Sequence, residues 1–140
     1  MSWGGVNFIA VAVATVAAMA LGAAWYGLLA RLWMAANGFS EADLSGPDGR
    51  PRGGGAIPYL VAGVSKAVMA FCLARLLALV DAVSVSNGIA LALFLWIGFV
   101  ATTLSVNHRF QMKPWTLTLI DGGYWLAVLI AQGIVIGLFG

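Results

Sequence analysis

Four long apolar stretches limit what this chain can fold into more than any other feature of its sequence. They cover about residues 6–29, 58–80, 87–106 and 115–139, and each is long enough to cross a hydrocarbon core of ~30 Å at about 1.5 Å per residue. Hydrophobic residues make up 62% of the chain and charged residues 9%, whereas roughly 25% of the residues in a soluble domain are charged. Because so few charges cannot cover a surface in water, we exclude a soluble fold.

The lengths of the stretches predict four transmembrane helices in one bundle, so that residues 1–140 form a single all-α membrane domain. A transmembrane barrel would need segments of ~10 residues that alternate between apolar and polar positions, and these stretches are longer and apolar all round. The first stretch has a possible signal-peptide cleavage site at Gly22-Ala23-Ala24. It lacks a basic N-terminal region and exceeds the usual ~7–15 apolar residues, so we expect it to remain in the mature protein.

Basic residues are confined to two connections, apart from Lys66 and Arg75 within the second stretch. The first connection holds Arg31, Arg50 and Arg52, and the third holds Arg109 and Lys113, whereas the two ends of the chain and the turn at 81–86 hold none. Since basic connections stay on the cytoplasmic side of a membrane, this pattern predicts that both chain termini lie on the outer side.

The first connection is the largest segment that we expect in water. Ser40, Glu41 and Asp43 indicate the start of a short interfacial helix, and the glycine- and proline-rich stretch 45–55 indicates a flexible linker. A phosphate-binding loop is the alternative, but the stretch lacks a Gly-Lys-Ser/Thr sequence and a preceding strand. The net charge of +2 is scattered among apolar segments, so no surface for nucleic acid is predicted.

Small residues recur every four positions along three of the stretches, where they allow helices to approach closely. They are Ala10, Ala14, Ala18 and Gly22 in the first stretch, Ala70, Ala74 and Ala78 in the second, and Gly133 and Gly137 in the fourth. Packing within one bundle is the simpler interpretation of this pattern. A surface for a homo-oligomer or for the helix of another membrane protein is the alternative.

Ionisable residues inside the apolar stretches are the main candidates for a functional site. Lys66 lies about 12 Å along its helix from the cytoplasmic side and Asp121 about 10 to 11 Å along its own. Because opposite charges at one depth compensate each other in a bilayer, we expect the two to meet inside the bundle. Thr118 and Gln132 lie on the same face as Asp121 and complete the predicted intramembrane polar site.

A second cluster of polar and aromatic residues is predicted at the cytoplasmic end of the first and third helices. Its members are Trp25, Tyr26, Arg31, Asn107, His108 and Arg109. An ordinary interfacial histidine is the simpler interpretation of His108, and a proton relay with Asp121 is the alternative, because imidazole changes charge near neutral pH. With one histidine, and with Cys72 as the only cysteine, we predict no metal site, no disulfide and no cofactor.

Three blocks of sequence carry a family resemblance. Gly22-Ala-Ala-Trp25-Tyr26 is followed by Trp33 and Gly38, Asn107-His108 comes later, and Asp121-Gly-Gly-Tyr124 lies in the last stretch. With these blocks the sequence resembles a bacterial family of small integral membrane proteins classified as a domain of unknown function. The resemblance covers almost the whole chain and implies a multi-pass protein of the bacterial inner membrane with about four helices. It implies no activity and no catalytic residue.

No catalytic motif stands out, since the chain has no Gly-x-Ser-x-Gly and Ser65 beside Lys66 lacks the context of a Ser/Lys hydrolase. We therefore expect a non-catalytic protein that acts by self-association or as part of a membrane complex, with lipid and other membrane helices as partners. The alternative is a small-solute or proton-linked transporter that uses Lys66 and Asp121. A lipid-modifying enzyme that uses Tyr26, His108 and Arg109 is the least expected class.

Overall fold

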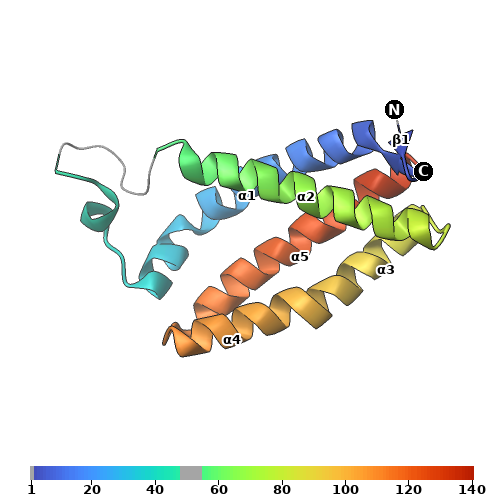
Figure 1. Ribbon diagram of the computed structural model, residues 1–140. Helices are drawn as coiled ribbons and strands as arrows, with labels where there is room; N and C mark the ends of the chain where they lie inside the picture. The colour runs from blue at the N-terminus through green and yellow to red at the C-terminus, as the bar shows by residue number, and fades with distance from the viewer. Residues whose placement is uncertain (1, 48–54) are drawn as a thin grey trace.

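The computed structural model describes residues 2–47 and 55–140, and helices make up most of it (Figure 1). Its elements in chain order are β1 (Ser2–Trp3), β2 (Val6–Asn7), α1 (Phe8–Asn37), η1 (Glu41–Leu44), α2 (Ile57–Leu79), α3 (Val85–Leu95), η2 (Trp96–Ala101), α4 (Thr102–Phe110) and α5 (Trp115–Leu138). The segment η1 is a 3-10 helix and η2 is π-helical. The elements α3, η2 and α4 follow one another without a break and form one long helix, Val85–Phe110.

Four helices are long and apolar enough to cross a membrane, which confirms the all-α architecture expected from the sequence. They are α1, α2, the long helix Val85–Phe110 and α5. The first helix continues beyond the predicted span, because residues 30–37 include several good helix formers. It ends where Gly38 adopts a left-handed conformation with φ of 74°, which glycine tolerates without strain.

The two ends of α1 are fixed by local interactions. At the start, the Asn7 side chain accepts hydrogen bonds from the backbone amides of Ile9 and Ala10, which satisfies two of the amides that a helix leaves free. Before it, β1 and β2 form a short antiparallel hairpin, which the sequence analysis did not predict. The Arg75 side chain of α2 donates a hydrogen bond to the carbonyl of Gly4, so the hairpin is attached to the end of α2.

The first connection contains the short helix predicted there. Ser40 caps η1 by accepting from the Asp43 amide, and the Asp43 carboxylate accepts from the Ser40 amide in return, which is the reciprocal pattern of a capping box. Of the predicted linker 45–55, residues 48–54 lie outside the described residues, and Arg50 and Arg52 lie there with them.

The helix α5 lies at the centre of the bundle and contacts α1, α2 and α3. Glycines bring α5 close to its neighbours: Gly133 faces the backbone of Gly88 in α3, Gly137 faces Ser84, and Gly22 of α1 lies against the Tyr124 hydroxyl. Ala14, Ala18, Ala70 and Ala74 are also buried inside the bundle. The described chain therefore uses the predicted small-residue positions for its own packing.

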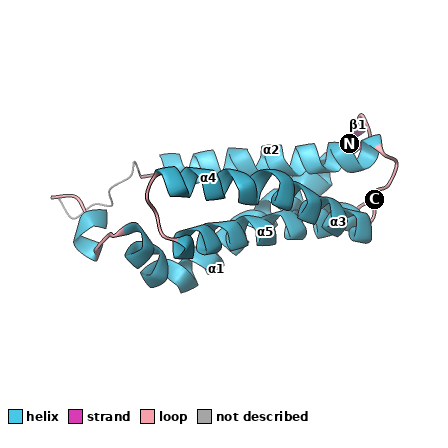
Figure 2. Cartoon of the chain, turned by 90° about the horizontal axis from the view of Figure 1, so that it is seen from below, coloured by secondary structure: helices cyan, strands magenta, loops and turns pink. Residues whose placement is uncertain are grey.

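Both termini lie at one end of the bundle (Figures 1 and 2). The first connection and the turn between α4 and α5 lie at the opposite end, which we call the basic end because it holds Arg109 and Lys113. That the basic end faces the cytoplasm stays a prediction from the distribution of charge.

Candidate functional site

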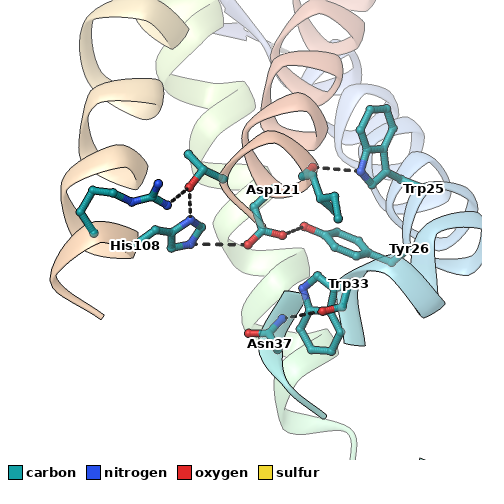
Figure 3. Close-up of polar contacts among 9 residues, drawn as sticks. Trp25, Tyr26, Trp33, Asn37, His108 and Asp121 are labelled. Atoms are coloured by element: carbon teal, nitrogen blue, oxygen red, sulfur yellow. Dashed lines mark hydrogen bonds and ion pairs between the residues drawn. The ribbon is translucent and has the colours of Figure 1, made fainter. Parts of the chain in front are cut away.

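A network of polar side chains joins α1, α4 and α5 in the half of the bundle nearer the basic end. The Tyr26 hydroxyl donates a hydrogen bond of 2.7 Å to Asp121 Oδ1, and Asp121 Oδ2 lies 3.7 Å from His108 Nε2. Figure 3 shows the Asp121 carboxylate between the imidazole and the phenol. On the far side of the ring, His108 Nδ1 lies 2.9 Å from Thr118 Oγ1. We use the name polar network for five residues: Tyr26, Asp121, His108, Thr118 and Arg109.

Arg109 closes the polar network on the α4 side. Its Nη2 donates a hydrogen bond of 2.6 Å to Thr118 Oγ1, and its guanidinium lies 3.7 Å from the ring centroid of Trp115. The stacked arrangement suits a guanidinium, which is planar and less strongly hydrated than an ammonium. Arg109 Nε is buried and has no hydrogen-bond partner among the described residues, so the network does not use every donor it contains.

The geometry around His108 is compatible with both charge states of the imidazole. In the neutral form, the Thr118 hydroxyl donates to Nδ1 and the Nε2 proton faces Asp121. In the cationic form, Nδ1 donates to Thr118 instead, because a hydroxyl oxygen can accept two hydrogen bonds, one of them from Arg109. His108 can therefore gain or lose a proton while it keeps both of its neighbours.

Two tryptophans hold the turn of α5 that carries Asp121. Trp25 of α1 donates its indole N–H to the carbonyl of Ile120 at 3.1 Å, and Trp96 of η2 donates to the carbonyl of Gly122 at 2.8 Å. A Cβ atom on Gly123 would lie 3.1 Å from the Trp25 ring, so Gly123 leaves room for that indole. No sequence pattern singled out Trp96. A tryptophan in the middle of a membrane span is itself a signal, because its N–H needs an acceptor there.

The π-helical segment η2 determines how α4 faces α5. A π-helical turn contains more residues than an α-helical turn, and such segments are frequent at functional sites. Because η2 precedes α4, it changes the rotation at which His108 and Arg109 meet Thr118. Hydropathy alone gave no sign of this change.

Lys66 lies in a different environment from Asp121. Its side chain is buried, with the residue 3% exposed, and its Nζ lies 5.4 Å from the ring centroid of Tyr124 and 5.3 Å from that of Trp125. The predicted pair with Asp121 is not formed: no ion pair joins the two described residues. The physical reason is that Tyr124 lies almost one helical turn beyond Asp121 in α5, while the Asp121 carboxylate is already held by two other side chains.

The predicted polar site is thus divided into two parts. Asp121 and Thr118 belong to the polar network, while Gln132 lies next to Lys66 and donates a 2.9 Å hydrogen bond from Nε2 to its backbone carbonyl. The Gln132 Oε1 atom is buried and has no partner among the described residues.

The predicted cytoplasmic-end cluster is only partly brought together. Trp25, Tyr26, His108 and Arg109 contact α5 or the polar network. Arg31 and Asn107 are exposed and stay outside it. Within residues 2–47 and 55–140, no three side chains of the types His, Cys, Asp and Glu gather to form a metal site.

Almost the whole chain is similar to one protein family. A family model described as a protein of unknown function (DUF1761) matches residues 9–137, and the chain belongs to this family. Neither a curated protein nor a solved structure matches the chain. Family and architecture together make it a multi-pass membrane protein from a family whose activity is open.

Proposed function

We propose that this member of the DUF1761 family is a proton-linked carrier of the bacterial inner membrane in which His108 and Asp121 bind the transported proton. One observation supports this most strongly: a carboxylate inside a membrane domain, 18% exposed, lies 3.7 Å from the imidazole of another span. Ionisable side chains are costly at such positions, and in membrane proteins they mark ion pathways and proton relays. Asp121 is the only acidic residue within the four helices that can span the membrane.

The groups around His108 and Asp121 favour a site that can exchange a proton while the protein stays folded. Arg109 from α4, Tyr26 from α1 and Tyr124 from α5 are the other ionisable groups packed around the pair, and Lys66 from α2 lies beyond Tyr124. When His108 takes up a proton, the imidazolium faces a carboxylate that already accepts from Tyr26. When it releases the proton, the Thr118 hydroxyl rotates to donate to Nδ1. Neither step requires a helix to move.

Proton movement into lipid vesicles tests this proposal. Purified protein is reconstituted with a pH-sensitive dye inside the vesicles, and a step to lower external pH drives protons inward, with and without a panel of small solutes. We expect flux above that of protein-free vesicles under at least one condition, and a loss of most of it in Asp121→Asn and His108→Gln. Asp81→Asn, in the turn between α2 and α3, is the matched control and keeps the flux. If wild-type vesicles stay at the protein-free level under every condition, the proposal is wrong.

Self-association is the second candidate function, and the exposed face of α4 favours it. The small-residue positions are occupied within the bundle, but the polar residues Thr102, Thr103 and Asn107 are exposed on α4, where with Val106 they line a shallow depression. Polar side chains in lipid gain from hydrogen bonds to a neighbouring helix. An amide both donates and accepts, so two Asn107 side chains can pair across a twofold axis between two copies of this chain.

Cysteine cross-linking in the membrane tests this second candidate. In a Cys72→Ser background that keeps Asn107, Val106→Cys is expected to form a disulfide-linked dimer on mild oxidation, because Val106 is 55% exposed and lines the same depression. Val16→Cys is the matched control, because Val16 is 69% exposed on α1, outside the proposed face, and is expected to stay monomeric. Equal cross-linking at both positions would indicate random collision and would exclude the α4 face as a specific interface.

A further inference from the structure

Lys66 is a buried cation without an anionic partner. Its ammonium makes no hydrogen bond and no ion pair within the described part of the chain, and the ring faces of Tyr124 and Trp125 are the interactions it has. The one acid within the membrane helices, Asp121, is held by Tyr26 and His108. Attraction to two aromatic rings offsets part of the cost of burying a charge, but it does not replace a counterion.

The surface of α2 beside Lys66 is uncovered at Gly63, on the side that faces the basic end. The Lys66 side chain points toward the start of its helix, as helical side chains do, and Gly63 occupies the turn in that direction. A Cβ atom on Gly63 would meet nothing within 4 Å. No other described helix therefore covers α2 at Gly63, one helical turn from Lys66, on the side from which ions from the water would arrive.

We propose that the Lys66 ammonium binds a small monovalent anion, such as a small carboxylate, on the side of the ammonium that faces away from the rings of Tyr124 and Trp125. A compact anion supplies the missing countercharge, while the faces of the two rings stabilise the ammonium from its other side. The role of this anion rests on the proposed carrier function: an anion at Lys66 and a proton at the His108–Asp121 pair would cross the membrane together without net charge. Binding itself does not depend on transport.

Thermal unfolding of the purified full-length chain in detergent tests for the anion. Sodium gluconate, whose anion is bulky, is replaced by sodium acetate or sodium chloride at constant ionic strength. In wild type we expect acetate or chloride to raise the unfolding midpoint, because a ligand that binds the folded state stabilises it. Lys66→Met should abolish this response, Lys66→Arg should retain it, and Lys113→Met, in the turn before α5, should leave it unchanged.

The same experiment also measures whether the charge lacks a partner. In gluconate, Lys66→Met should unfold at a higher temperature than wild type, because the substitution removes a buried charge that the chain itself does not pair. The proposal is overturned if Lys66→Met unfolds at a lower temperature, if it keeps the response to acetate and chloride, or if neither anion shifts the wild type. Anion binding without proton flux would refute the carrier function and still support the Lys66 site. Proton flux without anion binding would support the carrier function and refute the Lys66 site.

Discussion

At the scale of single residues, the two partners of Asp121 contribute in different ways. Tyr26 donates a short hydrogen bond from a hydroxyl that stays neutral, whereas His108 lies at ion-pair distance and can change its charge. Tyr26 therefore keeps the carboxylate in place, while in the proposed carrier His108 is the group that takes up and releases the proton. This division of roles leads to separate expectations for the two side chains.

Tyr26→Phe should lower stability without removing the proton-binding pair. A hydrogen bond to a charged group contributes about 1.5–3 kcal/mol, so we expect the free energy of unfolding to fall by an amount in this range. Denaturation in mixed detergent micelles measures it. The matched control is Tyr59→Phe, because Tyr59 is 73% exposed on α2 and should change stability little. If both variants lose the same amount, the Tyr26 hydrogen bond to Asp121 contributes nothing specific.

The sequence located the residues of the site better than it located their pairing. Asp121, Thr118, Tyr26, His108 and Arg109 were all candidates, because polar residues in or beside apolar stretches are conspicuous. The pairing of Lys66 with Asp121 was wrong, since depth along a helix does not give its rotation or tilt in the bundle. A lysine side chain is also long enough to end almost one turn from the level of its own Cα atom. The sequence indicated a contact between His108 and Asp121 only through the alternative interpretation of His108, in which it forms a proton relay with Asp121.

At the scale of helices, the contact between α3 and α5 depends on two glycines. Gly88 and Gly133 face each other so closely that a Cβ atom on either would overlap the backbone of the other. The sequence indicated Gly133 through its spacing to Gly137, but Gly88 stands alone in its helix and gave no such pattern. The π-helical segment was equally invisible, because its residues are as apolar as their neighbours. Close approach and helix rotation are tertiary properties that hydropathy does not encode.

Gly133→Ala should separate α3 from α5. Forcing a methyl group into such a contact costs typically about 1–3 kcal/mol, and the overlap here is with backbone atoms that cannot turn away. We expect a clear drop in the thermal unfolding midpoint of the purified protein. Gly63→Ala is the matched control, since it meets open space and alanine favours a helix over glycine; it should be neutral or slightly stabilising. If Gly133→Ala leaves the thermal unfolding midpoint unchanged, α3 and α5 are not in close contact.

At the scale of the whole molecule, the fold places both termini at one end and the basic connections at the other (Figure 1). Length and composition were sufficient to predict the four crossings, because a lipid environment allows few alternatives to helices. The orientation of the bundle in the membrane is predicted from the distribution of charge alone.

Reporter fusions test that direction. With the basic end in the cytoplasm, alkaline phosphatase fused after Gly140 should be active and green fluorescent protein fused there should be dark. The same reporters inserted after Gly46, in the first connection, should give the opposite result. Fluorescence from the fusion after Gly140 would show that the bundle is inverted.

Proton exchange at His108 while it faces Asp121 can be measured directly, because the chain has a single histidine. In protein labelled with ¹⁵N-histidine and held in lipid nanodiscs, the two ring nitrogens report the protonation of His108 alone. We predict that the folded protein exchanges between a ring with its one proton on Nε2 and a ring with protons on both nitrogens, and that Asp121→Asn alters this exchange while Asp81→Asn does not. A ring that keeps one protonation state in the folded protein, or the same exchange in Asp121→Asn as in wild type, would contradict proton exchange at His108.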